Sequence, residues 1–242
     1  MIRRNPGKSA TWAALGLPLA LGLAACGPLV EFGNSGPPPS LYALRSATTE
    51  DETPRALPSP LMVATPDPIA ELRPPRIAVF TSLTGVSYLP NSRWIDPPSR
   101  LMARLLEERL RRASSGMVLS PRQFDVGYDF RLNTRLVGFH VDATGGEHTA
   151  RVALEAVLLR TPTKDMPAPQ VIASARFATE RPLRSVQPDH VTETLNAAAN
   201  EVAAQLIDWI AGLNVNAPAQ TPASLPPATA PAPDTGDRPD VE

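Results

Sequence analysis

The chain has 242 residues, with 23 basic and 24 acidic side chains and a formal net charge of −1. This length predicts one domain of ordinary size with room for tails. The near-zero charge argues against nucleic acid as the main partner, because phosphate binding needs clustered excess Lys and Arg. The 29 prolines are concentrated outside residues 76–213. The packed domain is therefore expected mainly in that stretch, with flexible segments on both sides.

The first 25 residues have the organisation of a bacterial secretion signal. Arg3, Arg4 and Lys8 give a basic start without acids, and an apolar run from Trp12 to Leu23 follows. That run has roughly a dozen residues, whereas a membrane-spanning helix needs about 20. The sequence predicts a cleaved signal peptide over residues 1–25.

A single cysteine follows this signal directly. A lone cysteine leaves no intramolecular disulfide and no multi-thiolate metal site. Leu23-Ala24-Ala25-Cys26-Gly27 resembles the lipobox of bacterial lipoproteins. The resemblance implies a diacylglycerol on the sulfur of Cys26 and an acyl chain on its amino group, a stable anchor. The alternative is a buried cysteine beside an ordinary cleavage site. Gly27 stands where an aspartate would resemble an inner-membrane retention signal, so we expect an outer-membrane lipoprotein that faces the periplasm.

The mature chain begins with a tether, residues 26–40, that is rich in glycine and proline. Residues 40–44 alternate and predict a first strand. Residues 46–75 are a proline-rich insertion, either an ordered extended arm or a mobile loop. Residues 76–80 have the apolar pattern of a buried strand.

Two amphipathic helices are expected. Residues 97–113 place leucines on one half of a helical circle and charged residues on the other, with Ser99 as a candidate N-terminal cap. Arg109 falls on the apolar side and must reach solvent or a partner. The second helix runs from a cap at Asp189 to Gly212. Residues 214–242 are a Pro/Ala-rich acidic tail, which we expect to be disordered.

Four strand-like runs lie between the helices, and glycine or proline turns separate the last three. They are Gly116–Leu119, Leu132–Asp142, Thr149–Arg160 and Gln170–Thr179. The third alternates apolar and polar residues, which indicates a half-buried strand in an antiparallel meander. The order predicts an α/β (α+β) sandwich over residues 41–213, with two helices on one face of a mostly antiparallel sheet.

The sequence contains no pattern of residues that is typical of a catalytic site. His140, His148 and His190 do not stand at metal-ligand spacing. No nucleophile elbow, phosphate-binding loop or dinucleotide fingerprint is present. We therefore expect no catalytic residue, no metal site and no cofactor.

The most distinctive local feature is the segment from Tyr88 to Pro98, which the proline and asparagine content predicts to be a loop before a helix. Tyr88, Arg93 and Trp94 are of the residue types enriched at interaction hot spots. They are our candidate partner contacts. In the alternative interpretation, Trp94 packs this loop onto the core.

Several of these features, in this order, resemble the ABC-type transport auxiliary lipoprotein family, the PqiC-like proteins. They are Cys26, Tyr42-x-Leu44, Arg76–Phe80, Tyr88…Arg93-Trp94…Pro98, Leu136-Val137-Gly138-Phe139, Val152–Arg160, Phe177 and an alanine-rich final helix. The resemblance covers roughly residues 40–213. It implies a non-enzymatic periplasmic lipoprotein that serves an ABC permease and ATPase with an MCE-domain protein and moves phospholipid or other lipid between membranes.

A second function fits the same outline. Lipoproteins that activate an envelope enzyme, such as a peptidoglycan synthase, also combine a lipobox, a proline-rich tether and a small α/β domain. The order of the elements favours the transport accessory. The sequence leaves open whether the domain forms a homo-oligomer.

Overall fold

The computed structural model describes residues 38–47, 54–121 and 126–215. The predicted signal peptide, Cys26 and residues 216–242 of the predicted acidic tail lie outside these residues. The predicted start of the tail is wrong, because Val215 packs against the core and its carbonyl accepts a hydrogen bond from Arg160. The described part of the chain forms one mixed sheet of nine strands and two α-helices, which confirms the predicted α+β fold. None of its helices is both long enough and apolar enough to cross a membrane.

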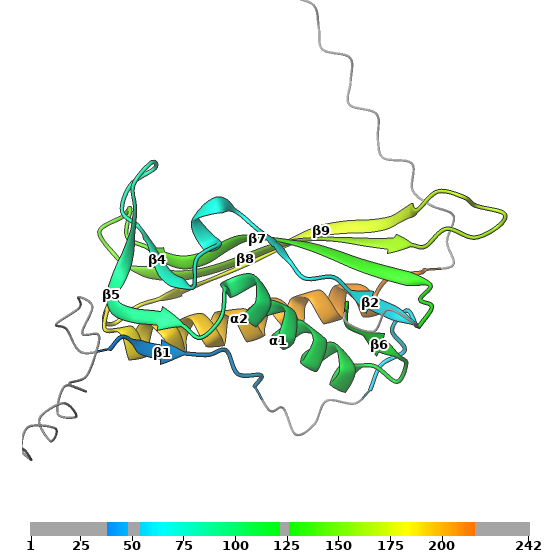
Figure 1. The fold of residues 1–242 in the computed structure, drawn as a ribbon, viewed down its shortest axis with the longest axis horizontal. Coiled ribbons are helices and arrows are strands. Elements are labelled where there is room, and N and C mark those ends of the chain that lie inside the picture. Colours follow the sequence, from blue (N-terminus) through cyan, green and yellow to red (C-terminus); the bar gives the residue numbers. More distant parts are fainter. Residues whose placement is uncertain (1–37, 48–53, 122–125, 216–242) are drawn as a thin grey trace, which may run out of the picture. The chain divides into compact units, whose positions relative to one another are not determined.

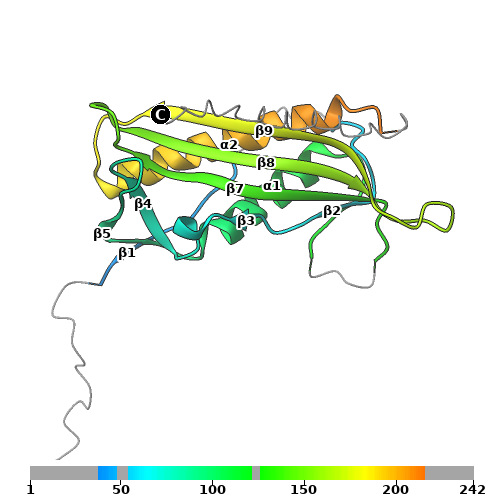
Figure 2. The same ribbon diagram turned by 90° about the horizontal axis from the view of Figure 1, so that it is seen from above.

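Three long antiparallel strands form the broadest part of the sheet (Figures 1 and 2). β7 (Phe130–Asp142) pairs with β8 (Thr149–Arg160), and β8 pairs with β9 (Gln170–Pro182). The predicted meander is therefore confirmed. β9 pairs with β8 alone among the described residues, so it forms one edge of the sheet.

Short strands run along the opposite side of β7. β2 (Leu61–Val63), β3 (Asp67–Pro68) and β4 (Arg76–Phe80) pair with successive parts of β7, and all three run parallel to it. A 3-10 turn, η1 (Ala70–Leu72), precedes β4. Of the two alternatives for the proline-rich segment, residues 54–75 form the ordered arm, because they supply two strands of the sheet.

The remaining strands extend the sheet beyond β4 and β2. β5 (Val86–Trp94) pairs antiparallel with β4, and β1 (Ser40–Tyr42) pairs parallel with β5. β6 (Val118–Leu119) pairs parallel with β2. β1 and β9 thus lie at opposite ends of the strand order β1-β5-β4-β7-β8-β9.

Both helices lie on the same face of the sheet, as predicted (Figures 1 and 2). α1 spans Pro98–Ala113 and α2 spans Pro188–Ala211. Their apolar sides are buried against the sheet and each other, because each helix repeats apolar residues at three- and four-residue spacing. β5 feeds directly into α1.

The predicted N-terminal caps are wrong. Pro97 and Gln187 precede the two helices, and neither makes a side-chain cap hydrogen bond. Ser99 lies inside the first turn of α1 and is buried. Asp189 lies inside the first turn of α2, where its carboxylate accepts a 2.5 Å hydrogen bond from the Tyr42 hydroxyl. A proline can start a helix without a side-chain cap, since its fixed φ and missing N–H suit the first position.

Two asparagines of α2 hold the segment that follows β1. The backbone N–H of Arg45 donates to Asn196 Oδ1 at 2.7 Å, and that of Ala47 donates to Asn200 Oδ1 at 2.7 Å. Asn200 Nδ2 in turn donates to the Arg45 carbonyl at 2.9 Å. Arg109 is buried beside them, with Nη1 3.5 Å from Asn200 Oδ1. The expected need of Arg109 for a partner is met here, and β1 is fixed to the domain body.

Candidate functional site

β5 determines where the three predicted contact residues point. The prediction of a loop from Tyr88 to Pro98 is wrong for Tyr88–Trp94, which belongs to this strand, so neighbouring side chains there point to opposite faces of the sheet. Trp94 faces the helices and is 1% exposed. Its ring centroid lies 5.2 Å from that of Phe139 in the core. Trp94 therefore packs β5 onto the core, as the alternative interpretation holds.

Tyr88 is half-buried and already has partners within the domain. The guanidinium carbon of Arg76 lies 4.0 Å from the centre of the Tyr88 ring, a cation–π contact. The Tyr88 hydroxyl donates to the carbonyl of Glu71 at 3.3 Å. These contacts fix the Tyr88 ring and the direction of Arg76, and they leave little of the tyrosine for a partner.

Arg93 is the exposed member of the three. The register places it beside Leu41 of β1 and opposite Arg76 of β4, and residues paired in this way point to the same face of the sheet. Ile95, two residues on, shares that face, and its N–H donates to the Tyr42 carbonyl at 2.7 Å. Leu41 and Ile95 are each 60% exposed. We call Leu41, Arg76, Arg93 and Ile95 the β1-edge patch.

Three members of this patch were not among the sequence predictions. Two of them had a signal in the sequence: Leu41 and Ile95 stand next to the inward-facing Tyr42 and Trp94, and alternation places neighbours on opposite faces. This signal could not be used, because alternation applies only within a strand and β5 was predicted to be a loop. Asn91 has a left-handed backbone (φ 49°) and Pro90 precedes it, which gives the segment the composition of a turn.

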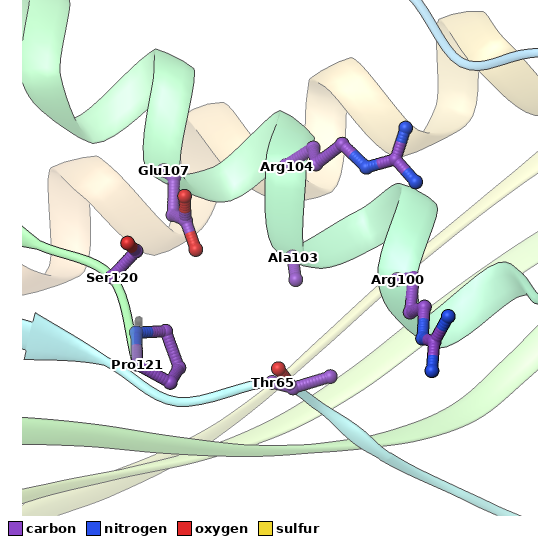
Figure 3. A pocket seen from close by; sticks show the side chains of 7 residues that line it. All are labelled: Thr65, Arg100, Ala103, Arg104, Glu107, Ser120 and Pro121. Carbon is purple, nitrogen blue, oxygen red and sulfur yellow. The ribbon is translucent and has the colours of Figure 1, made fainter. Parts of the chain in front are cut away.

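A second feature is a cavity of about 410 Å³ beside α1 (Figure 3). Figure 3 shows Ala103 and Glu107 facing Thr65 and Pro121 across it. Arg100 and Arg104 line its rim and both pair with Asp96, the former at 3.6 Å. Since these guanidinium groups are exposed and internally paired, the cavity offers polar walls but no concentrated charge. Its residues are Thr65, Arg100, Ala103, Arg104, Glu107, Ser120 and Pro121.

His140 is the buried histidine of the sheet. Its ring stacks on Phe80 with centroids 3.9 Å apart, and burial lowers its pKa from 6.5 to about 4. A neutral, stacked imidazole has a packing role. Among the described residues no group of three His, Cys, Asp or Glu side chains is placed to hold a metal ion.

The comparisons with known proteins give the family. The sequence profile of the ABC-type transport auxiliary lipoprotein component family matches residues 42–207, which run from β1 into α2. The chain belongs to this family. No curated protein matches the chain significantly.

Two solved structures share the fold of this chain. A protein of the DUF330 family from Xanthomonas campestris is 22% identical, with a TM-score of 0.55 over 71% of this chain and 95% of its own. A crystal structure titled only as an uncharacterized protein is 17% identical, with a TM-score of 0.52 over 72% and 99% of the two chains. At these identities the likeness shows the fold.

Proposed function

We propose that this chain is a lipid-anchored, periplasm-facing accessory subunit of an MCE-type ABC system that moves phospholipid or other lipid between the inner and outer membranes. It acts by docking and carries out no catalytic step. The single observation that supports this most is the family match over residues 42–207, since the family is an auxiliary component of ABC-type transport. The resemblance to the PqiC-like proteins implies the MCE-domain protein, the permease and the ATPase as partners.

The anchor in this proposal is Cys26. A diacylglycerol thioether and an N-acyl chain on one residue hold a protein stably on a bilayer, whereas one chain binds reversibly. Gly27 in the next position supports the outer membrane as the destination. Cys26→Ser removes the sulfur, and serine oxygen cannot form the thioether. Metabolic labelling with a palmitate analogue should label the wild-type chain only, and a labelled Cys26→Ser chain would contradict lipidation at this residue.

The docking element in this proposal is the β9 edge, because the three predicted contacts at β5 leave only Arg93 exposed. β9 is 13 residues long and has a neighbouring strand on one side only within the described part of the chain. Such an edge presents unpaired N–H and C=O groups, and an extended peptide can join it as a further strand. Val171, Ser174 and Ala178 are exposed along it. We propose that an extended segment of the MCE-domain protein pairs here.

The test is the set of proteins that the lipidated chain retains. Affinity purification of the full chain from detergent-solubilised envelopes should recover an MCE-domain protein together with an ABC permease and ATPase. A β9 variant, Ser174→Pro, removes one backbone donor at the edge and should reduce recovery. The exposed Glu108→Gln on α1 is the matched control and should not. Recovery of a peptidoglycan synthase in place of the ABC subunits would contradict the proposal and favour the activator function.

A further inference from the structure

The β1-edge patch combines two cationic and two large aliphatic side chains on one face of the sheet. Arg76 and Arg93 stand directly opposite on adjacent antiparallel strands. Like charges in that position destabilise a sheet. Among the described residues no carboxylate lies within ion-pair distance of either guanidinium. The register thus places two cations on one face of the sheet, with Arg76 resting on the Tyr88 ring, and a bound anion would offset their mutual repulsion.

Two large aliphatic side chains flank the cations. Leu41 lies beside Arg93, and Ile95 follows on the same face, each with 60% of its surface exposed. A single exposed apolar residue is ordinary, but adjoining ones rimmed by charge indicate an interaction site. The backbone that carries Leu41 is held in place, because the Tyr42–Asp189 and Arg45–Asn196 hydrogen bonds join β1 and the segment after it to α2. The patch is therefore a surface whose backbone is fixed to the domain.

The position of the patch along the chain points to its occupant. The first strand begins at Ser40, only 13 residues after Gly27 begins the predicted tether. A chain of that length spans at most about 45 Å when fully extended. If Cys26 is anchored as proposed, β1 is the strand nearest to the bilayer along the chain. A phospholipid surface offers phosphate oxygens, which guanidinium groups bind in bidentate fashion, above an apolar layer that accepts leucine and isoleucine.

We propose that the β1-edge patch is a membrane-contact surface, in which Arg76 and Arg93 bind phosphate groups of anionic phospholipid and Leu41 and Ile95 enter the boundary of the acyl layer. The inference rests on the proposed anchor. It adds an orientation: the β1 edge meets the lipid, and the β9 edge, at the other end of the strand order, is turned away from it toward the partner.

The test uses the mature lipidated protein reconstituted into vesicles. Its own cysteine is blocked by the thioether, so Ile95→Cys introduces the single reactive thiol for an environment-sensitive fluorophore. Nitroxide-labelled phospholipid then reports whether the probe touches the acyl layer. Val171→Cys on β9, 44% exposed, is the matched control. Vesicles are phosphatidylcholine with or without phosphatidylglycerol, and mass spectrometry with flotation reports the anchor separately.

The proposal predicts strong quenching at position 95, little at position 171, and an increase with phosphatidylglycerol. Arg76→Gln with Arg93→Gln should weaken the attraction about fivefold per charge removed. Salt should also weaken the attraction to phosphatidylglycerol, since raising the ionic strength from about 0.1 M to 1 M shortens the Debye length from about 10 Å to 3 Å.

Three outcomes would overturn the proposal while leaving the anchor intact. Position 95 could stay unquenched in anchored protein, or both positions could be quenched alike. The double arginine variant could also keep its quenching yet lose the co-purifying ABC subunits, which would assign the patch to a protein partner. Failure of the anchor itself would appear as an unacylated mass and loss of flotation.

Discussion

Trp94→Ala tests whether Trp94 is a core residue or a contact residue. The ring is 1% exposed and packs on Phe139, so truncation removes about 200 Å² of buried aromatic surface. At about 25 cal/mol per Å² that burial corresponds to roughly 5 kcal/mol, and measured Trp or Phe truncations cost about 3–5 kcal/mol. We expect a loss of about 4 kcal/mol. For a domain of this size that lowers Tm by about 8–16 °C.

The measurement is thermal and urea unfolding followed by circular dichroism, with two matched controls. Trp94→Phe keeps most of the apolar volume and removes the indole Nε1, which is buried without a hydrogen bond among the described residues. It should cost only about 1–2 kcal/mol. Ile95→Ala, next in sequence but 60% exposed, should change stability by less than about 0.5 kcal/mol.

The reasoning would be refuted by a Trp94→Ala domain that melts within about 3 °C of wild type. If that variant also lost its partner, Trp94 would be a direct contact after all. Partner loss that accompanies the expected drop in Tm reports unfolding and supports the core assignment.

Three further predictions concern stability and boundaries. Burial lowers the pKa of His140 to about 4. The stability that the neutral His140 contributes is therefore complete above pH 6.5 and is lost as the pH falls toward 4. Urea unfolding at pH 5 should show about 2 kcal/mol less stability than at pH 7 from this group, and His140→Gln, which still faces Asp142 and Arg151, should remove that part of the difference. Gly138→Ala should cost about 1–3 kcal/mol, because the new Cβ would lie 3.0 Å from Ala153 Cβ, whereas Gly146→Ala meets nothing within 4 Å and should be neutral by the same assay. Deleting residues 216–242 should leave Tm unchanged, because seven prolines and few large apolar residues give this segment little to pack. A deletion that also removes Val215, whose carbonyl accepts a hydrogen bond from Arg160, should lower Tm.

The hydrophobic periodicity of the sequence was sufficient to predict those helices and strands whose local pattern agrees with their tertiary environment. The alternation in Thr149–Arg160 and the helical repeat in residues 97–113 predicted β8 and α1 closely. Their packing partners impose the same period that the sequence shows. Residues 76–80 likewise correspond to β4.

The failures have physical causes in non-local pairing. β2 and β3 are short and proline-bounded, and they become strands only because β7, far along the chain, supplies their hydrogen bonds. β5 contains Pro90 and Asn91 beside a shift in register with β4, so its local composition is that of a turn. Once β5 is a strand, alternation assigns Trp94 to the core and Arg93 to the surface. The candidate site thus depended on one element that local propensity cannot identify.

The central claim, docking to an MCE-domain subunit through the β9 edge, is tested most directly by photocrosslinking in living cells. A photoreactive amino acid at Ser174 on β9, with one at Glu108 on α1 as control, reports which protein lies against each surface of the full lipidated chain. The account predicts an adduct with an MCE-domain protein from position 174 and none from position 108. An adduct at position 174 with a peptidoglycan synthase, or the MCE adduct from position 108 alone, would contradict it.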